Sequence, residues 1–191
     1  MRVEVTKVTQ WFDVLDAARF TQRKEASCKE PSDKFKKQIV IAEHSPLRCL
    51  MFNIDFYDIP YYVAMHLRTH KLVHQPFVST SRPDIDGNMK PRSEQKKDDP
   101  VNMKLFLDAQ EIIAISKVRL CNRAEPITKK VWKFAIEELA KKEPTLAAAC
   151  VPQCLYRGFC PEPKSCGFSE CEVFTAKRQE YINRLTSQVS R

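Results

Sequence analysis

Glycine is scarce in this chain, with only Gly87, Gly158 and Gly167 among its 191 residues. A phosphate-cradling P-loop and a G-x-G-x-x-G turn each need several glycines close together, where the backbone must approach the phosphates. Three glycines this far apart can build neither loop. The sequence therefore excludes the commonest nucleotide-binding architectures, and any bound phosphate must be held by cationic side chains.

Long apolar segments are also missing. No apolar run approaches the ~20 residues that a membrane-spanning helix needs, and no hydrophobic signal segment follows residues 1–5. Hydrophobic residues nevertheless make up 43% of the chain, which is enough for the core of one domain or of a compact two-lobed subunit. We therefore expect a globular cytoplasmic protein without a membrane contact.

Positive charge is in excess, with 32 Lys and Arg against 24 Asp and Glu, and the net charge is +8. The resulting pI of about 9.1 favours anionic partners such as nucleotides, polyphosphate cofactors or nucleic acid. Aromatic residues rarely alternate with the basic ones, as they do where bases stack on a protein surface. Nucleic acid thus stays possible but is not favoured.

Three of the four histidines lie in the segment 58–86. Asp58 and Pro60 are typical of a helix start, and the apolar spacing after them predicts a helix. At helical spacing, His66 and His70 share one face of that helix.

A short strand is expected at residues 77–81, where aromatic and β-branched residues precede a Pro-Asp turn. Helix and strand would then bring His70 and Lys71 to the same end as Ser79 and Arg82. These side chains could together hold an anion. The alternative is that the histidines are ordinary core or surface groups and that Arg82 is a solvated charge.

Hydrophobic periodicity predicts the remaining elements. Two i,i+4 ion pairs, Glu137 with Lys141 and Glu138 with Lys142, support one long helix. Strands are expected at residues 2–8 and 51–56, and helices at residues 10–20, 32–42, 102–120, 126–143 and 170–189.

Arg119 lies on the apolar stripe of the helix expected at 102–120, seven residues after Ile112 and four after Ile115. A guanidinium on a buried stripe is costly without a partner, so it must meet a carboxylate or a bound anion. Arg123 follows one turn later. The residues leave open whether Arg119 forms a structural ion pair or an anion-binding site.

Five of the eight cysteines fall within 22 residues near the C-terminus. Their spacings are not the C-x2-C pairs of common zinc folds, yet four thiolates this close could bind Zn²⁺. Reduced, half-buried cysteines in a Pro-rich turn segment are the alternative. We assign no metal ligand to the active site. The five residues are Cys150, Cys154, Cys160, Cys166 and Cys171.

Residues 43–56, EHSPLRCLMFNIDF, and 59–82 resemble the first half of the flavin-dependent thymidylate synthase (ThyX) family. That family has a G-H-x-S-P-x-E-H segment followed by the signature R-H-R-x-x-S-x-N-x-x-S-x-R. Residues 69–71, Thr-His-Lys, stand on its R-H-R and Ser79 on its second serine, while Arg82 lies one residue beyond its last arginine. The variant signature is more similar to phage-type members, which implies a divergent protein in the host cytoplasm.

Residues 108–124, DAQEIIAISKVRLCNRA, look like the second block of the same family, N-x-R-x-L-x-x-F-x-x-L-R followed by A-Q-W-E. Arg119 stands on the arginine that contacts the substrate nucleotide there. Glu125 and Pro126 replace the family's Gln-Trp. Together the two blocks span roughly residues 43–125.

The resemblance implies an α+β subunit with a small antiparallel sheet and several long helices. Residues 1–148 would form the ThyX-like domain, and residues 149–191 a cysteine-rich turn segment and C-terminal helix packed on the same subunit. It also implies a homotetramer with shared active sites, which uses FAD, NADPH and methylenetetrahydrofolate to methylate dUMP or a related pyrimidine nucleotide. Reduced flavin carries the hydride and the methylene, so the protein needs no nucleophile of its own.

The same resemblance assigns the site residues. Two other interpretations stay open: a non-catalytic family member that binds nucleotide or flavin, and a basic nucleic-acid-binding protein with a cysteine knuckle. The residues expected at the nucleotide are Ser79, Arg82 and Arg119, the last also as the catalytic residue, and those expected beside FAD are His44, His70, Lys71 and Arg123.

Overall fold

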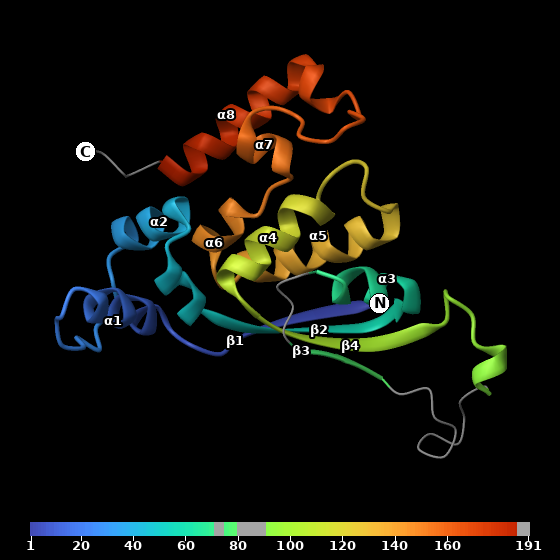
Figure 1. The fold of residues 1–191 in the computed structure, drawn as a ribbon, viewed down its shortest axis with the longest axis horizontal. Helices are drawn as coiled ribbons and strands as arrows, with labels where there is room; N and C mark the ends of the chain where they lie inside the picture. Colours follow the sequence, from blue (N-terminus) through green and yellow to red (C-terminus); the bar gives the residue numbers. More distant parts are fainter. Residues whose placement is uncertain (71–74, 80–90, 187–191) are drawn as a thin grey trace.

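A twisted antiparallel sheet carries the helices of this protein on one face (Figure 1). The computed structural model describes residues 1–70, 75–79 and 91–186. Within these ranges four strands pair in the order β1-β2-β4-β3. The α+β class with a small antiparallel sheet is confirmed. The strands are β1 Arg2–Lys7, β2 Met51–Pro60, β3 Gln75–Val78 and β4 Pro100–Asp108.

Alternation along the strands explains why helices cover only one face. Phe52, Ile54 and Phe56 of β2 are fully buried, and Ile54 pairs with the buried Leu105 of β4. Asp55 points to the other face, where it pairs with a lysine of β4 at 3.2 Å. Burying each large apolar side chain contributes about 1.5–3 kcal/mol, so this row fixes the register of the central strands.

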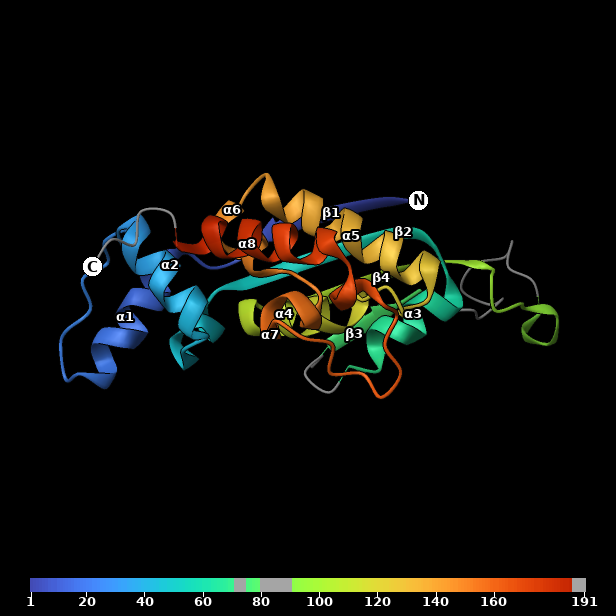
Figure 2. The same ribbon diagram turned by 90° about the horizontal axis from the view of Figure 1, so that it is seen from above.

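Several helices of the described ranges pack on that apolar face, and the C-terminal helix lies outside them against α2, α6 and α7 (Figure 2). None of them is long and apolar enough to cross a membrane. The elements are α1 Trp11–Thr21, α2 Asp33–Ala42, η1 Ser45–Cys49, α3 Tyr61–Arg68, η2 Arg92–Glu94, α4 Ala109–Arg119, α5 Pro126–Ala140, α6 Pro144–Ala149, α7 Gln153–Arg157, η3 Phe168–Glu170 and α8 Glu172–Thr186.

The helix expected at residues 102–120 is wrong in its first part, which forms strand β4. Asp108 ends that strand and caps α4, since its carboxylate accepts a hydrogen bond from the Glu111 N–H at 2.8 Å. The Glu111 carboxylate in turn accepts from the Asp108 N–H at 2.7 Å, which completes a capping box. Apolar residues at alternate positions before Asp108 face the core, so the period is two there and becomes helical only after it.

The helix expected to be capped by Asp58 also begins later, so this prediction is wrong. Asp58 lies inside β2 at a φ of 55°, and its N–H donates to the side chain of Asn102 at 3.1 Å. Helix α3 starts only after Pro60 and ends two residues before His70. His66 and His70 therefore do not share a helical face.

The other expected elements are present, and those of their ends that fall in the described ranges are displaced by up to four residues, while the ends expected at residues 81 and 189 lie outside the described residues. In α5 the predicted partners are wrong: Glu137 pairs with Lys133 at 3.6 Å and Glu138 with Lys141 at 2.5 Å. Lys142 instead donates to a backbone carbonyl of β1. Exposed pairs of this kind contribute only about 0.2–1 kcal/mol, so their exchange costs the helix little.

A buried carboxylate ties the N-terminal strand to the helical layer. Glu143, between α5 and α6, accepts hydrogen bonds from Lys7 and from the indole nitrogen of Trp11, the latter at 2.7 Å. Trp11 is itself only 1% exposed. A buried charge is tolerated where every partner is present, as it is here.

The C-terminal segment beyond residue 148 packs on α2, α4 and α6. Gly158 ends α7 at a φ of 85°, a conformation that favours glycine. The guanidinium of Arg178, on α8, fills the space that a Cβ on Gly158 would need. The absence of a side chain at this position therefore lets α7 and α8 approach each other.

Candidate functional site

Arg119 ends helix α4 and turns its half-buried guanidinium toward α3 and the residues after it. Its Nε donates to Nε2 of His70 at 2.7 Å, and its Nη2 donates to the backbone carbonyl of His66. Among the described residues no carboxylate forms an ion pair with it. Both partners are uncharged acceptors, so the guanidinium is oriented without being neutralised.

His70 is a neutral imidazole in this arrangement. Burial, followed by the adjacent charge of Arg119, lowers the pKa of His70 to about 4. A neutral ring that accepts at Nε2 carries its proton on Nδ1. Burial also lowers the pKa of Arg119, but a guanidinium stays charged in proteins. The pair therefore carries one positive charge and can attract an anion.

A second chain of hydrogen bonds reaches this region from the start of α5. Glu125 caps the helix by accepting from the N–H groups of Ile127 at 3.0 Å and Thr128 at 2.6 Å. The same carboxylate accepts from the hydroxyl of Thr128 at 2.8 Å, and Nδ1 of His66 lies 2.9 Å from that hydroxyl. Burial raises the pKa of Glu125, but the hydrogen bonds from Thr128 and Ile127 outweigh it and leave the pKa lowered.

The structure brings together only part of the predicted set. Arg119 and His70 are in direct contact. Ser79 is exposed, and its hydroxyl accepts from the backbone N–H of Asn102, beside the end of β3. Arg123 is exposed in the turn after α4. Two further predicted residues, Lys71 and Arg82, lie outside the described residues.

His44 lies at the other end of α4. It is exposed before η1, where Gln110 of α4 accepts from Arg48 at 2.6 Å and donates to the carbonyl of Glu43. Nine residues separate Gln110 from the end of α4, which is about 13 Å along a helix. Within one chain, therefore, His44 and Arg119 do not meet.

Sequence reasoning missed Thr128 and Glu125, and it considered His66 only for a helix face that does not exist. A signal for the helix start was present in E-P-I-T, because Pro at the first helical position is typical of it. The link from this cap to His66 joins residues 62 positions apart, which no local pattern indicates.

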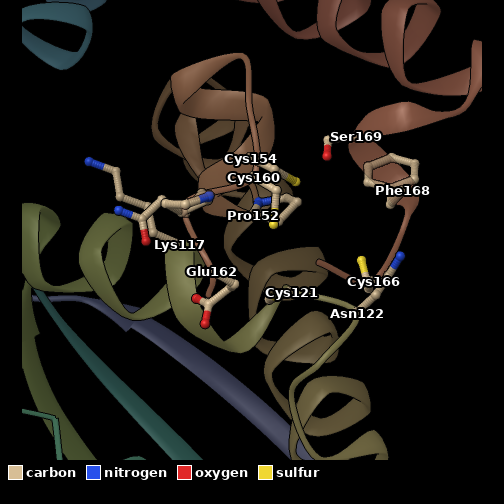
Figure 3. Close-up of a pocket in the computed structure, with 12 residues that line it drawn as sticks. Lys117, Cys121, Asn122, Pro152, Cys154, Cys160, Glu162, Cys166, Phe168 and Ser169 are labelled. Carbon is tan, nitrogen blue, oxygen red and sulfur yellow. The ribbon is translucent and has the colours of Figure 1, made fainter. Parts of the chain in front are cut away.

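At the C-terminal end of α4, on the side away from the Arg119 contacts, a pocket is lined by cysteines (Figure 3). Cys121 comes from the turn after α4 and Cys154 from α7, while Cys160 and Cys166 come from the segment between α7 and η3. Lys117 also lines it and places its ammonium 3.7 Å from the ring centre of a tyrosine of α7. The pocket therefore draws on four thiols from three stretches of chain.

The five tail cysteines do not gather as the zinc hypothesis required. Cys150 is buried and donates to a carbonyl of α6 at 3.5 Å, and Cys171 donates to the carbonyl of Phe168 at 3.0 Å. No group of three or more His, Cys, Asp or Glu side chains in the described ranges could hold a metal ion. Cys121, which the sequence did not connect with the tail, lines the pocket, whereas Cys150 and Cys171 do not.

Comparison with known proteins gives matches in structure but not in sequence. No family model matches this chain, and no curated protein does. The flavin-dependent thymidylate synthase ThyX from Helicobacter pylori, complexed with FAD and dUMP, aligns with a TM-score of 0.65 at 14% identity, over 79% of this chain and 100% of that one. A second structure of that protein with FAD and dUMP gives a TM-score of 0.64 at 14% identity, over 79% and 99%.

The UMP/dUMP methylase PolB from Streptomyces cacaoi, bound with 5-Br dUMP, also matches. Its TM-score is 0.59 at 12% identity, over 78% of this chain and 94% of that one. This chain therefore has the fold of the ThyX-type thymidylate synthases, which confirms the fold that the sequence blocks implied.

Proposed function

We propose that this protein binds dUMP or a related pyrimidine deoxynucleotide and transfers a one-carbon unit to it, as a flavin-dependent thymidylate synthase-like methyltransferase. The observation that carries the proposal is the guanidinium of Arg119, which is held by two uncharged acceptors. A cation held in this way keeps its charge for an anionic ligand. The neighbour from Helicobacter pylori, solved with FAD and dUMP, supports this choice of ligands.

In this proposal the protein itself positions the nucleotide and stabilises its negative charge. Arg119 would donate to the phosphate or to an ionised pyrimidine oxygen, and His70 would keep the guanidinium in its plane without adding charge. FAD, when bound, would supply the redox and one-carbon chemistry, with NADPH and methylenetetrahydrofolate as co-substrates. No side chain need act as a nucleophile in this scheme.

The remaining roles follow the sequence resemblance and are part of the proposal. His44 and Arg119 lie at opposite ends of α4, so we propose a homotetramer in which sites are shared between subunits. Arg119, Ser79 and Arg82 are proposed for the nucleotide, and His44, His70, Lys71 and Arg123 for FAD.

Calorimetric titration of dUMP into wild type and Arg119→Ala tests the nucleotide site. We expect the substitution to weaken binding by about 2–4 kcal/mol, the scale for losing a charge-assisted contact. The free energy of unfolding of the unliganded protein should change by less than about 1 kcal/mol, because no buried carboxylate is left unpaired. Lys130→Ala, which removes an exposed cation of α5, is the matched control and should bind dUMP like wild type.

A structural role for Arg119 predicts the opposite pattern. The unliganded variant would then lose about 3–5 kcal/mol of stability and keep the dUMP-induced shift in melting temperature. Titration of FAD, followed by flavin fluorescence, separates the further candidates. Binding of dUMP without FAD would favour a nucleotide-binding protein without turnover, and binding of neither would favour the nucleic-acid-binding alternative.

A further inference from the structure

His66 stands out among the described histidines because one of its ring nitrogens is tied to a carboxylate through a hydroxyl. Nδ1 lies 2.9 Å from the hydroxyl oxygen of Thr128, and that oxygen lies 2.8 Å from Oε2 of Glu125. Thr128 is fully buried, so its hydroxyl has no access to water. The three groups form one chain from α3 to the cap of α5.

The direction of these bonds is fixed by simple counting. An ionised carboxylate only accepts, so the single hydroxyl proton of Thr128 must go to Glu125. The hydroxyl oxygen is then left as an acceptor for His66, and Nδ1 of that ring must carry a proton. The charge of Glu125 therefore permits only one direction for this chain of hydrogen bonds.

The two histidines near Arg119 thus share a tautomer but differ at Nε2. In His70 the Nε2 lone pair accepts from the Arg119 guanidinium. In His66 no hydrogen bond to Nε2 is present among the described residues, and the ring is only partly buried. A neutral His66 therefore offers an open lone pair, next to the site where Arg119 is proposed to hold the nucleotide.

We propose that His66 is the proton-accepting residue of the Arg119 site, with Thr128 and Glu125 as the positioning residues that fix its tautomer. The inference rests on the proposed function. As C5 of the pyrimidine bonds to the one-carbon unit of methylenetetrahydrofolate, the bond between that carbon and the folate nitrogen breaks and its electron pair stays on the nitrogen. The C5–H bond then breaks, its electron pair returns to the ring, and the proton moves to Nε2 of His66. The imidazolium that forms is stabilised by the Glu125 carboxylate through the intervening hydroxyl.

The surroundings of the ring suit this role. Tyr62 meets His66 edge to face, with ring centres 5.7 Å apart, which holds the imidazole plane. Burial and the nearby charge of Glu125 raise the pKa of Tyr62, so this phenol stays neutral. The Arg119 guanidinium also lies near the residue, but it bonds to the backbone carbonyl of His66 rather than to its ring.

Nitrogen NMR of the full-length protein, labelled in its four histidines, tests the proposal without any need for turnover. We expect the unliganded wild type to show His66 in the Nδ1–H form, with His70 as an internal reference for the same tautomer. Thr128→Ser keeps the hydroxyl and should preserve this form. Thr128→Val is nearly isosteric but lacks the hydroxyl, and it should give a mixture of tautomers.

Addition of dUMP then tests whether Nε2 of His66 lies at the nucleotide site. At saturation, verified independently by calorimetry, the Nε2 resonance of His66 should move in wild type and in Thr128→Ser. In the one-carbon transfer assay, Thr128→Val should lose roughly tenfold to hundredfold in kcat with little change in KM, and Thr128→Ser should retain most of the rate.

Two results would overturn the inference. One is an Nε2–H form of His66 in the wild type, and the other is an Nε2 resonance that stays unchanged while calorimetry shows the nucleotide bound. Absence of any dUMP binding would instead remove the proposed function, and with it the substrate on which this step depends. The tautomer, the resonance shift and the binding heat are separate measurements, so the two failures are distinguishable.

Discussion

Only Leu120 lies between Arg119 and Cys121, yet the two residues belong to regions of opposite character. On the Arg119 side, α3, α4 and α5 each contribute a partner, and the donors and acceptors match. On the Cys121 side, four thiols line a pocket but do not form a metal site. Burial, with smaller effects from Cys121 and Cys160, raises the pKa of Cys154, which keeps it a protonated thiol.

The comparison teaches which kind of clustering marks a site. The tail cysteines are close in sequence and share a reactive group, yet only three of the five reach the pocket, while Cys150 and Cys171 form local hydrogen bonds elsewhere. Arg119 and His70, and likewise His66 and Thr128, are far apart in sequence and differ in type, and the structure joins each pair by a hydrogen bond, of 2.7 Å and 2.9 Å respectively. Complementary partners from different elements are therefore the better indicator of function here.

The largest effect on stability is expected from a substitution that disturbs the region of the cysteine pocket and leaves the Arg119 site unchanged. Gly158→Ala forces a side chain into a positive φ and displaces the Arg178 guanidinium, the end of a flexible side chain, so we expect a loss of roughly 2–3 kcal/mol in the free energy of unfolding, most of it from the backbone. Cys154 should then react faster with a thiol reagent, because the packing of α7 against α8 is disturbed. Binding of dUMP should stay at the wild-type level.

Gly167→Ala is the matched control for that substitution. Gly167 also has a positive φ, of 78°, but a Cβ there would meet nothing within 4 Å, so the loss should be only about 1–2 kcal/mol. Equal losses in the two variants would show that the contact with Arg178 contributes nothing. Weaker dUMP binding in Gly158→Ala would show that the two sides of α4 are not independent.

A smaller effect concerns the pH dependence of the free energy of unfolding, which reports on the contact between His70 and Arg119. His70 has a pKa of about 4 in the folded protein, below its ordinary value of 6.5, so the unfolded chain binds the extra proton first as the pH falls. Stability is therefore fully present above pH 6.5 and is lost between pH 6.5 and 4. Because the ring is only half-buried, we discount the full linkage and expect a loss of about 1–2 kcal/mol.

Chemical denaturation at a series of pH values measures this loss. His70→Gln should flatten the slope between pH 4 and 6.5, while His44→Gln, which changes an exposed histidine, should keep it. An unchanged slope in His70→Gln would mean that the contact with Arg119 does not control the titration of that ring.

The smallest effect is expected for the thiols themselves. Cys160→Ser should change the free energy of unfolding by only tenths of a kcal/mol, about the scale of ordinary surface substitutions. Metal analysis of the purified protein should find no stoichiometric zinc. One zinc per chain, together with a loss of several kcal/mol in Cys160→Ser, would show instead that the cysteines form a structural metal site, since metal binding contributes folding free energy.

How much the sequence could predict differs between these regions. The direction of Arg119 followed from its spacing to Ile112 and Ile115, and that phase held although the start of the helix was placed too early. The boundary was missed because a strand period and a helix period meet at Asp108 without a glycine or proline between them. The capping box of Asp108 and Glu111 was the available signal.

The partners of Arg119 could not be predicted, because they depend on how α3 and α5 pack beside α4. His70 is 49 residues away in sequence from Arg119, and no local pattern connects them. The hypothesis of a shared zinc site for the tail cysteines failed for the opposite reason. Their spacing suggested a common ligand, but Cys150 and Cys171 donate locally to carbonyls of a short helix and a turn and so do not join a shared site.

Glu143 carries a consequence for the order in which the chain is made. Its carboxylate receives Lys7 and Trp11, which precede it by 136 and 132 residues. During synthesis, strand β1 and helix α1 must wait until Glu143, which follows Lys7 by 136 residues, has left the ribosome before these bonds can close. Contacts of such high sequence separation slow folding and leave early segments exposed, so chaperones should meet this protein through its N-terminal residues.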